Sequence, residues 1–360
     1  MRISNTFNDF YKGKRVLVTG HTGFKGAWLA QVLLNFGADV VGVSLKPNTK
    51  PNLFDVLSIE NKIKNYFTDI RDCPALRKIF EDEKPEIVFH LAAQALVRAS
   101  YDDPIGTIAT NVLGTANVLE AIKESGCVKS AVIITTDKVY ENKEQGRPFV
   151  EADPLGGYDP YSASKSAADI VANCYIKSFF NPDYFGAKHN TLVAITRAGN
   201  VIGGGDWADN RIIPDIVRVA YAGAGMEVRS PSAIRPWQHV LEPLLGYMML
   251  GKGLYEGDTT LSGAWNFGPQ SESFVTVKGL LDEVVKNKVV FDCEIKPDNS
   301  KHEAGILKLD ITKAQNVLHW TPKLNFSETI KSTFDWYKNY YEKLEDVVEF
   351  TNKQINTFLK

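Results

Sequence analysis

An acid and a base stand side by side in "VIITTDKVYENK" (residues 132–143), where Asp137 is followed directly by Lys138. The residues before them are rich in Val and Ile, which is typical of a strand buried on both faces. A carboxyl and an amine at the end of such a strand can serve as general acid and general base. The alternative is a solvated ion pair at a strand end, which would do little. We expect both residues to be catalytic.

A second reactive pair is Tyr161 and Lys165 in "YDPYSASKSAADIV". Residues four apart on a helix share one face, so the phenol and the amine lie a turn apart. A nearby ammonium favours the phenolate, so we expect Lys165 to lower the pKa of Tyr161 from about 10 and make it a usable base. The spacing alone also arises by chance between two solvated side chains, so its meaning depends on the surrounding elements.

A glycine loop supplies that context. In "VTGHTGFKG", Gly20, Gly23 and Gly26 directly follow a strand and open a helix. Glycines there let the backbone approach a pyrophosphate, which sits at the positive end of the helix. A merely tight turn is the alternative, but the succession of strand, loop and helix predicts a dinucleotide site. We assign Thr22 and Phe24 of the same loop to this site.

The elements that must position these residues alternate between strand and helix, which predicts an α/β fold with a doubly wound, Rossmann-type parallel sheet. Five Val- and Ile-rich runs, at 15–20, 39–45, 86–93, 130–136 and 190–197, form the predicted sheet. Helices are predicted at 26–37 and 111–126, each ended by a glycine, and "ETIKSTFDWYKNYYEKLEDVVEF" predicts a packing helix near the C-terminus. After residue 200 the alternation weakens, which indicates a smaller C-terminal lobe.

Composition excludes several classes of function. The 360 residues are 44% hydrophobic and 23% charged with a formal charge of -2, so neither a nucleic-acid footprint nor a membrane partner is expected. The cysteines show no CxxC pair, which favours reduced thiols in the cytoplasm and no metal site; they are Cys73, Cys127, Cys174 and Cys293. "MRISNTFNDFYKGKR" lacks the apolar region of a secretory signal, which also predicts a cytoplasmic protein.

The GxxGxxG spacing and the Tyr161/Lys165 pair resemble the extended short-chain dehydrogenase/reductase family. This resemblance implies that Tyr161 moves a hydroxyl proton, that Lys165 also holds the nicotinamide ribose, and that Thr136 hydrogen-bonds the reacting oxygen. Asp69 and Ile70 match the family's adenine-contacting pair, although a surface turn is the alternative. The cofactor-lining residues at the end of the third strand are Leu91, Ala92 and Ala93.

The nicotinamide cofactor is expected to be NAD, but the second strand leaves NADP open. An NAD enzyme normally carries an acid at the end of this strand, where it binds the ribose hydroxyls. Here the strand ends in "GVSLKP", which has no acid, and Lys46 permits a 2'-phosphate.

A simple dehydrogenase or 4-epimerase of this family has no use for Asp137 and Lys138. "TTDKVY" is similar to the Thr-Asp-Glu of nucleotide-sugar 4,6-dehydratases, with Lys in place of Glu. That departure resembles the CDP-glucose branch, as do "TRAGNVIGGGDWADNRIIPD" and "IRPWQHVLEPL", and the resemblance runs from about residue 10 to about 340. It implies an NAD-dependent lyase that converts CDP-D-glucose to CDP-4-keto-6-deoxy-D-glucose for a bacterial surface polysaccharide such as the lipopolysaccharide O-antigen.

In that chemistry Asp137 protonates the departing C6 hydroxyl, which requires a raised pKa, whereas a cationic Lys138 would lower it. A neutral Lys138 would remove the conflict and could take the C5 proton, so we expect burial to lower its pKa. Lys138 could instead orient a water or the substrate.

The resemblance also assigns the substrate side. Asn200 matches the asparagine near the sugar-nucleotide diphosphate, and guanidinium groups suit a diphosphate, although each arginine could equally be a surface ion-pair partner. His90 is interpreted as structural. The predicted substrate-binding residues are Gln94, Tyr101, Asn200, Arg211, Arg235 and His239.

These assignments imply a dinucleotide-binding domain of residues 1–199 with about 236–268 and 315–342. A nucleotide-sugar-binding lobe is expected at about 200–235 and 269–314, with a helical tail at 343–360. Family members pair the helix that holds Tyr161 with its copy, so we expect a homodimer or a dimer of dimers. The rivals are an epimerase or reductase of the same fold and an inactive cofactor-sensing protein; a nucleic-acid-binding module ranks below both.

Overall fold

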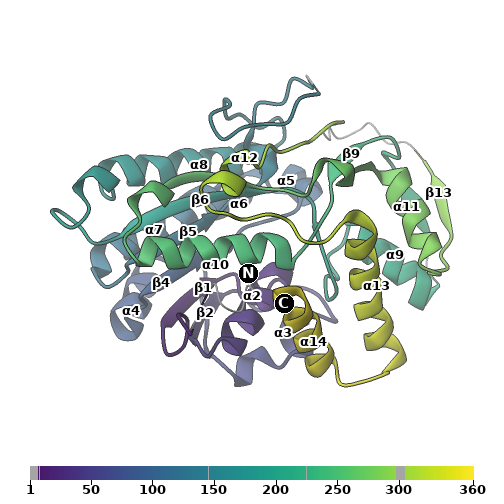
Figure 1. The fold of residues 1–360 in the computed structure, drawn as a ribbon, viewed down its shortest axis with the longest axis horizontal. Helices are drawn as coiled ribbons and strands as arrows, with labels where there is room; N and C mark the ends of the chain where they lie inside the picture. The colour runs from purple at the N-terminus through teal and green to yellow at the C-terminus, as the bar shows by residue number, and fades with distance from the viewer. Residues whose placement is uncertain (1–6, 8, 145, 224, 297–304) are drawn as a thin grey trace.

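The computed structural model describes residues 7, 9–144, 146–223, 225–296 and 305–360. Its centre is a seven-stranded, all-parallel sheet in the order β11-β6-β5-β4-β1-β2-β3 (Figure 1). The strand order reverses between β1 and β4, which is where doubly wound folds bind their ligands. The strands are β1 (Arg15–Thr19), β2 (Asp39–Ser44), β3 (Lys64–Phe67), β4 (Ile87–His90), β5 (Ser130–Ile134), β6 (Leu192–Ala198) and β11 (Gly263–Phe267).

The fold class is confirmed, and the sheet has two strands more than the sequence predicts. β3 and β11 are the edge strands, and neither carries the continuous apolar run by which the inner strands are recognised. β3 reads "KNYF" with both ends exposed, because a sheet edge is buried less than its centre.

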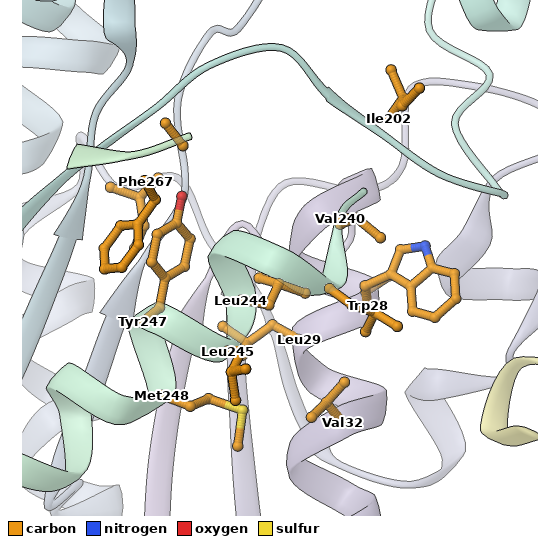
Figure 2. Close-up of a cluster of buried hydrophobic side chains, with 14 of the residues drawn as sticks. Trp28, Leu29, Val32, Ile202, Val240, Leu244, Leu245, Tyr247, Met248 and Phe267 are labelled. Atoms are coloured by element: carbon orange, nitrogen blue, oxygen red, sulfur yellow. The ribbon is translucent and has the colours of Figure 1, made fainter. Parts of the chain in front are cut away.

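Helices cover both faces of the sheet. α2 (Phe24–Asn35) and α10 (Leu241–Tyr255) pack on one face through a cluster that includes Trp28, Leu29 and Leu244 (Figure 2). The other face is covered by α4 (Cys73–Glu83), α7 (Gly114–Ser125) and α8 (Pro160–Ser178). Neighbouring residues of a strand alternate between the two cores, as their side chains must.

Two glycines end helices as predicted. Gly37 has a φ of +74° just after α2, and Gly126 caps α7 with a φ of +63°, a conformation in which other residues are strained. The predicted helix at 111–126 begins earlier in the structure, because α6 (Pro104–Ile108) and a π-helical turn (Ala109–Leu113) run directly into α7.

Beyond β6 the chain forms a second group of elements beside the carboxyl ends of the strands. Three small sheets pair β7 (Val201–Ile202) with β10 (Gln238–His239), β9 (Ile234–Pro236) with β12 (Phe274–Thr276), and β8 (Met226–Val228) with β13 (Cys293–Ile295). The accompanying helices are α9 (Ile212–Ala222) and α11 (Val277–Lys286), whereas α12 (Thr312–Asn316) packs on β11 of the central sheet. The division into domains stays a prediction.

The predicted C-terminal packing helix is two helices, α13 (Phe326–Glu342) and α14 (Val347–Leu359). The break follows from Lys343, which has a φ of +51°, and from Asp346, whose carboxylate caps the amides of Val348 and Glu349. α14 then packs beside α2, where Gln31 donates a 3.0 Å hydrogen bond to Asn352.

The remaining helices are short: α3 (Leu53–Val56), α5 (Val97–Asp102) and the 3₁₀ turns Ile59–Asn61, Asp137–Val139, Pro182–Tyr184, Thr259–Leu261 and Ser271–Ser273. Within the described residues, none of the helices combines the length and apolar character that a membrane crossing needs.

Candidate active site

A cavity of about 590 Å³ lies at the carboxyl ends of the central strands. Its walls come from the glycine loop, from the ends of β2, β4, β5 and β6, from the start of α8, and from the second group of elements. Every predicted cofactor residue lines it: Gly20, Thr22, Gly23, Phe24, Gly26, Asp69, Ile70, Leu91, Ala92, Ala93, Tyr161 and Lys165.

The glycine loop has the geometry that a dinucleotide requires. Gly20 has a φ of +76°, and a Cβ there would lie 2.7 Å from the backbone nitrogen of Ala92. A Cβ on Gly26 would lie 2.1 Å from the carbonyl oxygen of Gly20, so only glycine lets α2 start this close to β1. Gly23 is the N-cap of α2 and has no side chain to cover the first amides of the helix. The loop therefore fits a diphosphate at the positive end of α2.

The predicted adenine contacts, Asp69 and Ile70, line this cavity. Asp69 forms an ion pair with Arg71, with 2.6 Å between Oδ2 and Nη2, and Ile70 packs against Gly114 of α7. Lys46 also lines the cavity, with its Nζ 5.6 Å from the ring centroid of Phe67.

Asp137 is held at the end of β5 in a buried position. Thr136 Oγ1 donates a 3.0 Å hydrogen bond to Asp137 Oδ1, whereas Oδ2 has no hydrogen-bond partner among the described residues. Burial raises the pKa of Asp137, and the opposing effects of Lys138, Thr136 and Arg235 do not cancel this. The sequence-based requirement of a raised pKa is met. Lys138 is half-buried and lines the same cavity.

Tyr161 and Lys165 lie on the first turns of α8. Asp159 caps the helix by accepting a 2.9 Å hydrogen bond from the amide of Ser162, and Ser100 Oγ accepts a 3.0 Å bond from the amide of Tyr161. Lys165 Nζ donates a 2.8 Å hydrogen bond to the carbonyl oxygen of Ile134, which ties α8 to the end of β5.

The expected lowering of the Tyr161 pKa by Lys165 is wrong for this structure. Burial raises the pKa of Tyr161 to about 12, and the nearby Asp137 adds to this, while a hydrogen bond with Thr136 acts in the other direction. Burial also lowers the pKa of Lys165 to about 8. The reason is that the sequence argument considered the neighbouring charge alone, whereas removal from water disfavours the charged form of both groups.

A buried polar network supports the end of β5 from behind. Asp169, one turn beyond Lys165, accepts two 2.8 Å hydrogen bonds from the guanidinium of Arg197 and a 3.1 Å bond from Thr135 Oγ1. Arg197 also donates to the hydroxyl of Tyr140 at 3.0 Å. Because Thr135 and Tyr140 flank the segment with Asp137 and Lys138, this network fixes both ends of the turn that holds them.

Three of the predicted substrate-binding residues reach the cavity: Asn200, Arg211 and Arg235. Arg211 Nη1 lies 2.9 Å from Asp206 Oδ2, and its charge also acts on Tyr161. Arg235 is 5% exposed and acts electrostatically on Asp137, so the two guanidinium groups lie near Tyr161 and Asp137.

The other three predicted substrate residues are not among the described residues that line the cavity, and their assignment stays a prediction. The Gln94 side chain forms hydrogen bonds with Leu96 in its own loop and with Thr107 of α6. Tyr101 lies on α5, which packs against α8. His239 is fully buried beside Trp28 and Ser332, because β10 lies behind the cavity wall.

His90 is structural, as predicted. Its ring nitrogens lie 2.7 Å from Thr19 Oγ1 and 2.9 Å from Thr115 Oγ1, and burial lowers its pKa to about 3. Within the described residues, His, Cys, Asp and Glu do not gather into groups of three that could hold a metal ion.

Sequence reasoning missed several cavity-lining residues. Lys25 stands inside the glycine loop and could have been noticed there, since the ammonium group of a lysine can form an ion pair with a diphosphate. The others are Arg98, Asp206, Asn210, Asp215, Glu227, Arg229 and Ser230. Asp206, Asn210 and Asp215 stand in "TRAGNVIGGGDWADNRIIPD" and could have been noticed there, whereas no quoted stretch contains Glu227 or Arg229.

Comparisons with known proteins agree with this geometry. Residues 17–333 match the family model described as GDP-mannose 4,6 dehydratase. The chain is 44% identical to a CDP-glucose 4,6-dehydratase of Salmonella typhimurium strain LT2, over 98% of each chain. It also resembles the crystal structure of the dTDP-glucose 4,6-dehydratase DesIV from Streptomyces venezuelae with NAD bound, with a TM-score of 0.77 at 23% identity over 92% of this chain and 99% of that one. A UDP-glucose 4-epimerase of Thermus thermophilus in complex with NAD gives a TM-score of 0.76 at 24% identity, over 90% and 99% of the two chains.

Proposed function

Because the chain belongs to the GDP-mannose 4,6 dehydratase family of extended short-chain dehydrogenases/reductases, we propose that it is an NAD-dependent CDP-glucose 4,6-dehydratase. The proposed reaction converts CDP-D-glucose to CDP-4-keto-6-deoxy-D-glucose and water. The observation that carries it is Asp137: a buried carboxyl with a raised pKa and an oxygen without a hydrogen-bond partner among the described residues, in the same cavity as Tyr161 and Lys165.

The cofactor site fits NAD through its glycine loop, and Lys165 and Tyr161 lie where they could hold the nicotinamide end. When bound, the nicotinamide supplies a hydride acceptor that takes hydride from C4 of the sugar and returns it to C6. In this proposal Tyr161 accepts the proton of the C4 hydroxyl. Thr136, which is hydrogen-bonded to Tyr161, orients the C4 oxygen. The pKa of about 12 already includes the lowering effect of the Arg211 charge, so the Tyr161 phenolate needs stabilisation beyond what the protein alone provides.

Elimination of water then relies on Asp137 and Lys138. A ketone at C4 acidifies the C5 hydrogen, so a base at C5 and an acid at the C6 hydroxyl can expel water. Asp137 is suited to be the acid because its raised pKa favours the protonated form. Lys138 follows it directly and lines the cavity, so its amine is the proposed base at C5.

An epimerase or reductase of the same fold is the alternative, and similarity to the epimerase structure supports it at the level of fold only. Such enzymes have no elimination step, so a buried acid beside Tyr161 would serve no purpose in them. An inactive cofactor-sensing protein would likewise not require the Tyr161 and Lys165 pair.

The test is to incubate the purified protein with CDP-glucose and a catalytic amount of NAD and to follow the sugar nucleotide by mass spectrometry. A dehydratase removes one water without accumulation of NADH. An unchanged mass with CDP-glucose, followed by loss of water from the GDP, UDP or dTDP sugar, would overturn the proposed nucleobase. An unchanged mass with all four sugars would favour the epimerase or the sensor.

The role of Lys138 is tested by Lys138→Ala, which is expected to leave C4 oxidation measurable while slowing loss of water at least 100-fold. Lys143→Ala is the matched control. Lys143 lies on the loop that follows, its Nζ is 3.2 Å from Glu141 Oε1, and it is not among the residues that line the cavity. Release of water by Lys138→Ala at the wild-type rate would exclude Lys138 as the base.

We also infer a homodimer in the cytoplasm that supplies deoxysugar synthesis for a surface polysaccharide such as the O-antigen. Apolar side chains exposed on α6, the π turn and α8 support self-association: Ile105, Ile108, Leu113 and Ile170. All four cysteines are free thiols, in keeping with a reducing compartment. Sedimentation at working concentration should give a dimer or larger assembly, and a monodisperse monomer would reject it. Deletion of the gene should remove a deoxysugar from the surface polysaccharide, measured by sugar analysis.

A further inference from the structure

Lys25 is a charged residue of the cavity that the proposed reaction leaves without a role. It stands between Phe24 and Gly26 in the glycine loop, on the first turn of α2. Its side chain is half-buried and lines the same cavity as Asp137 and Lys165. A lysine whose only purpose was solubility would point outward into solvent, so its inward position needs an explanation.

The ammonium of Lys25 is held from the side of α10. Its Nζ donates a 3.1 Å hydrogen bond to the hydroxyl of Tyr247 and lies 5.2 Å from the centroid of that ring. Tyr247 is fully buried. Figure 2 shows Tyr247 on α10, with its hydroxyl pointing away from Leu245 and Met248. This contact keeps Lys25 at a defined place in the cavity wall.

The charges that face Lys25 come from three other segments. Lys165 of α8 and Arg211, just before α9, are cations and repel it, and Asp137 at the end of β5 attracts it. Burial is the largest influence, and together these effects lower the pKa of Lys25 to about 7. In the free protein, therefore, a large fraction of Lys25 is neutral near neutral pH.

We propose that Lys25 is a charge partner for the diphosphate of the bound dinucleotide and that it takes up a proton from solvent when the dinucleotide binds. A diphosphate places two negative charges at the start of α2, directly beside Lys25 in the chain. Those charges reverse the local balance from repulsion by cations to attraction, and the protonated amine then gains a charge-assisted hydrogen bond or ion pair. The inference rests on the proposed NAD cofactor and is independent of which sugar nucleotide is the substrate.

A diphosphate could also come from the nucleotide sugar, and the structure favours the cofactor. Lys25 belongs to the loop whose glycines and uncapped amides are shaped for the dinucleotide. The candidate partners of the sugar-nucleotide diphosphate, Arg211 and Arg235, come from the second group of elements instead.

The experiment is calorimetric titration of the full-length protein, freed of dinucleotide carried over from expression, with NAD and separately with CDP. Titrations at pH 7.5 in phosphate and in Tris, whose ionisation enthalpies differ, give the number of protons taken up on binding. The wild type is expected to take up a fraction of a proton with NAD. Lys25→Met should lose most of this uptake and bind NAD about tenfold or more weakly, while its affinity for CDP stays within twofold.

Two further variants separate the explanations. Lys25→Arg keeps a permanent charge, so it should retain NAD affinity within a few fold but show no uptake. Lys46→Met removes another cavity lysine and should leave the uptake unchanged. Unaltered melting temperatures confirm that the variants are folded.

The inference is overturned if Lys25→Met keeps the wild-type uptake, which would assign the proton to Lys165, or if it keeps wild-type NAD affinity. Loss of CDP binding in place of NAD binding would overturn it as well, by assigning Lys25 to the sugar nucleotide. The dehydration assay is independent of these titrations. A protein that shows the Lys25-dependent uptake but removes no water from CDP-glucose would therefore reject the proposed function alone.

Discussion

Asp137 and Glu242 are two buried carboxyls with similar surroundings and different uses. They are 2% and 1% exposed, each has one oxygen without a hydrogen-bond partner among the described residues, and burial raises the pKa of both. Asp137 ends β5 and opens onto the cavity. Glu242 is on the first turn of α10, where its Oε1 accepts 2.8 and 2.7 Å hydrogen bonds from the amides of Lys323 and Leu324.

The difference between them shows that a raised pKa does not by itself mark a catalytic acid. Glu242 is absent from the cavity wall as described, and its carboxyl anchors the segment before α13 to α10. Asp137 differs because the residue lines the cavity and its Oδ2 has no hydrogen-bond partner among the described residues, so its proton is available to a ligand. A third buried carboxyl, Asp169, completes the comparison, because Arg197 and Thr135 satisfy both of its oxygens.

The largest expected effect is that of Asp137→Asn on catalysis. An amide cannot donate the proton that the C6 hydroxyl needs, so kcat for water loss should fall by about 10² to 10⁴. Oxidation at C4 should remain measurable as a transient reduced cofactor at 340 nm in a single turnover. The melting temperature should not fall, since the variant no longer buries an ionisable acid.

Glu242→Gln is the matched control for that result, because it neutralises an equally buried carboxyl outside the cavity. Its kcat should stay within about threefold of the wild type. Equal losses of activity in the two variants would mean that neutralising any buried acid disturbs the fold, and the role of Asp137 would then lose its support.

The next effect concerns stability. Arg197→Met leaves Asp169 as a buried carboxylate without its cationic partner, which should lower the free energy of unfolding by about 3 to 5 kcal/mol. Denaturant titration measures this. The double variant Arg197→Met, Asp169→Asn should recover part of the loss. Arg77→Met, which breaks an exposed pair with Glu124, should change stability by less than about 0.5 kcal/mol. A similar small loss for Arg197→Met would show that the buried network does not stabilise the turn.

Local patterns were sufficient to predict the inner sheet and the cofactor loop. β1, β2, β4, β5 and β6 are continuous apolar runs, and the glycines follow β1 directly, so short stretches of sequence contain the information. β3 and β11 could not be found this way, because edge strands are partly exposed and their residues are chosen by the neighbours they pack against.

The substrate wall was harder to predict for a related reason. Asn200, Arg211 and Arg235 follow recognisable stretches and reach the cavity, but His239 is only four residues beyond Arg235 and turns into the core beside Trp28. Which of two nearby residues faces a cavity depends on the packing of β10 against β7. The pKa of Tyr161 was mispredicted for the same reason. The sequence shows the neighbouring Lys165 but does not show burial, which is the largest influence and raises the pKa.

The smallest effect, and the one that most sharpens the comparison, is the pH dependence that Glu242 gives to stability. Burial raises the pKa of Glu242 from 4.5 to about 7. Below about pH 4.5 the carboxyl is protonated in both states, and between that pH and about 7 only the unfolded chain ionises. The contribution of Glu242 to the free energy of unfolding therefore falls as the pH rises through this window, by about 3 kcal/mol at most, and is constant above it.

In Glu242→Gln this slope is absent, so the difference in stability between variant and wild type should increase in favour of the variant from pH 5 to pH 7.5. Denaturant titrations at several pH values measure the difference, and parallel curves would show that Glu242 ionises normally in the folded protein despite its burial.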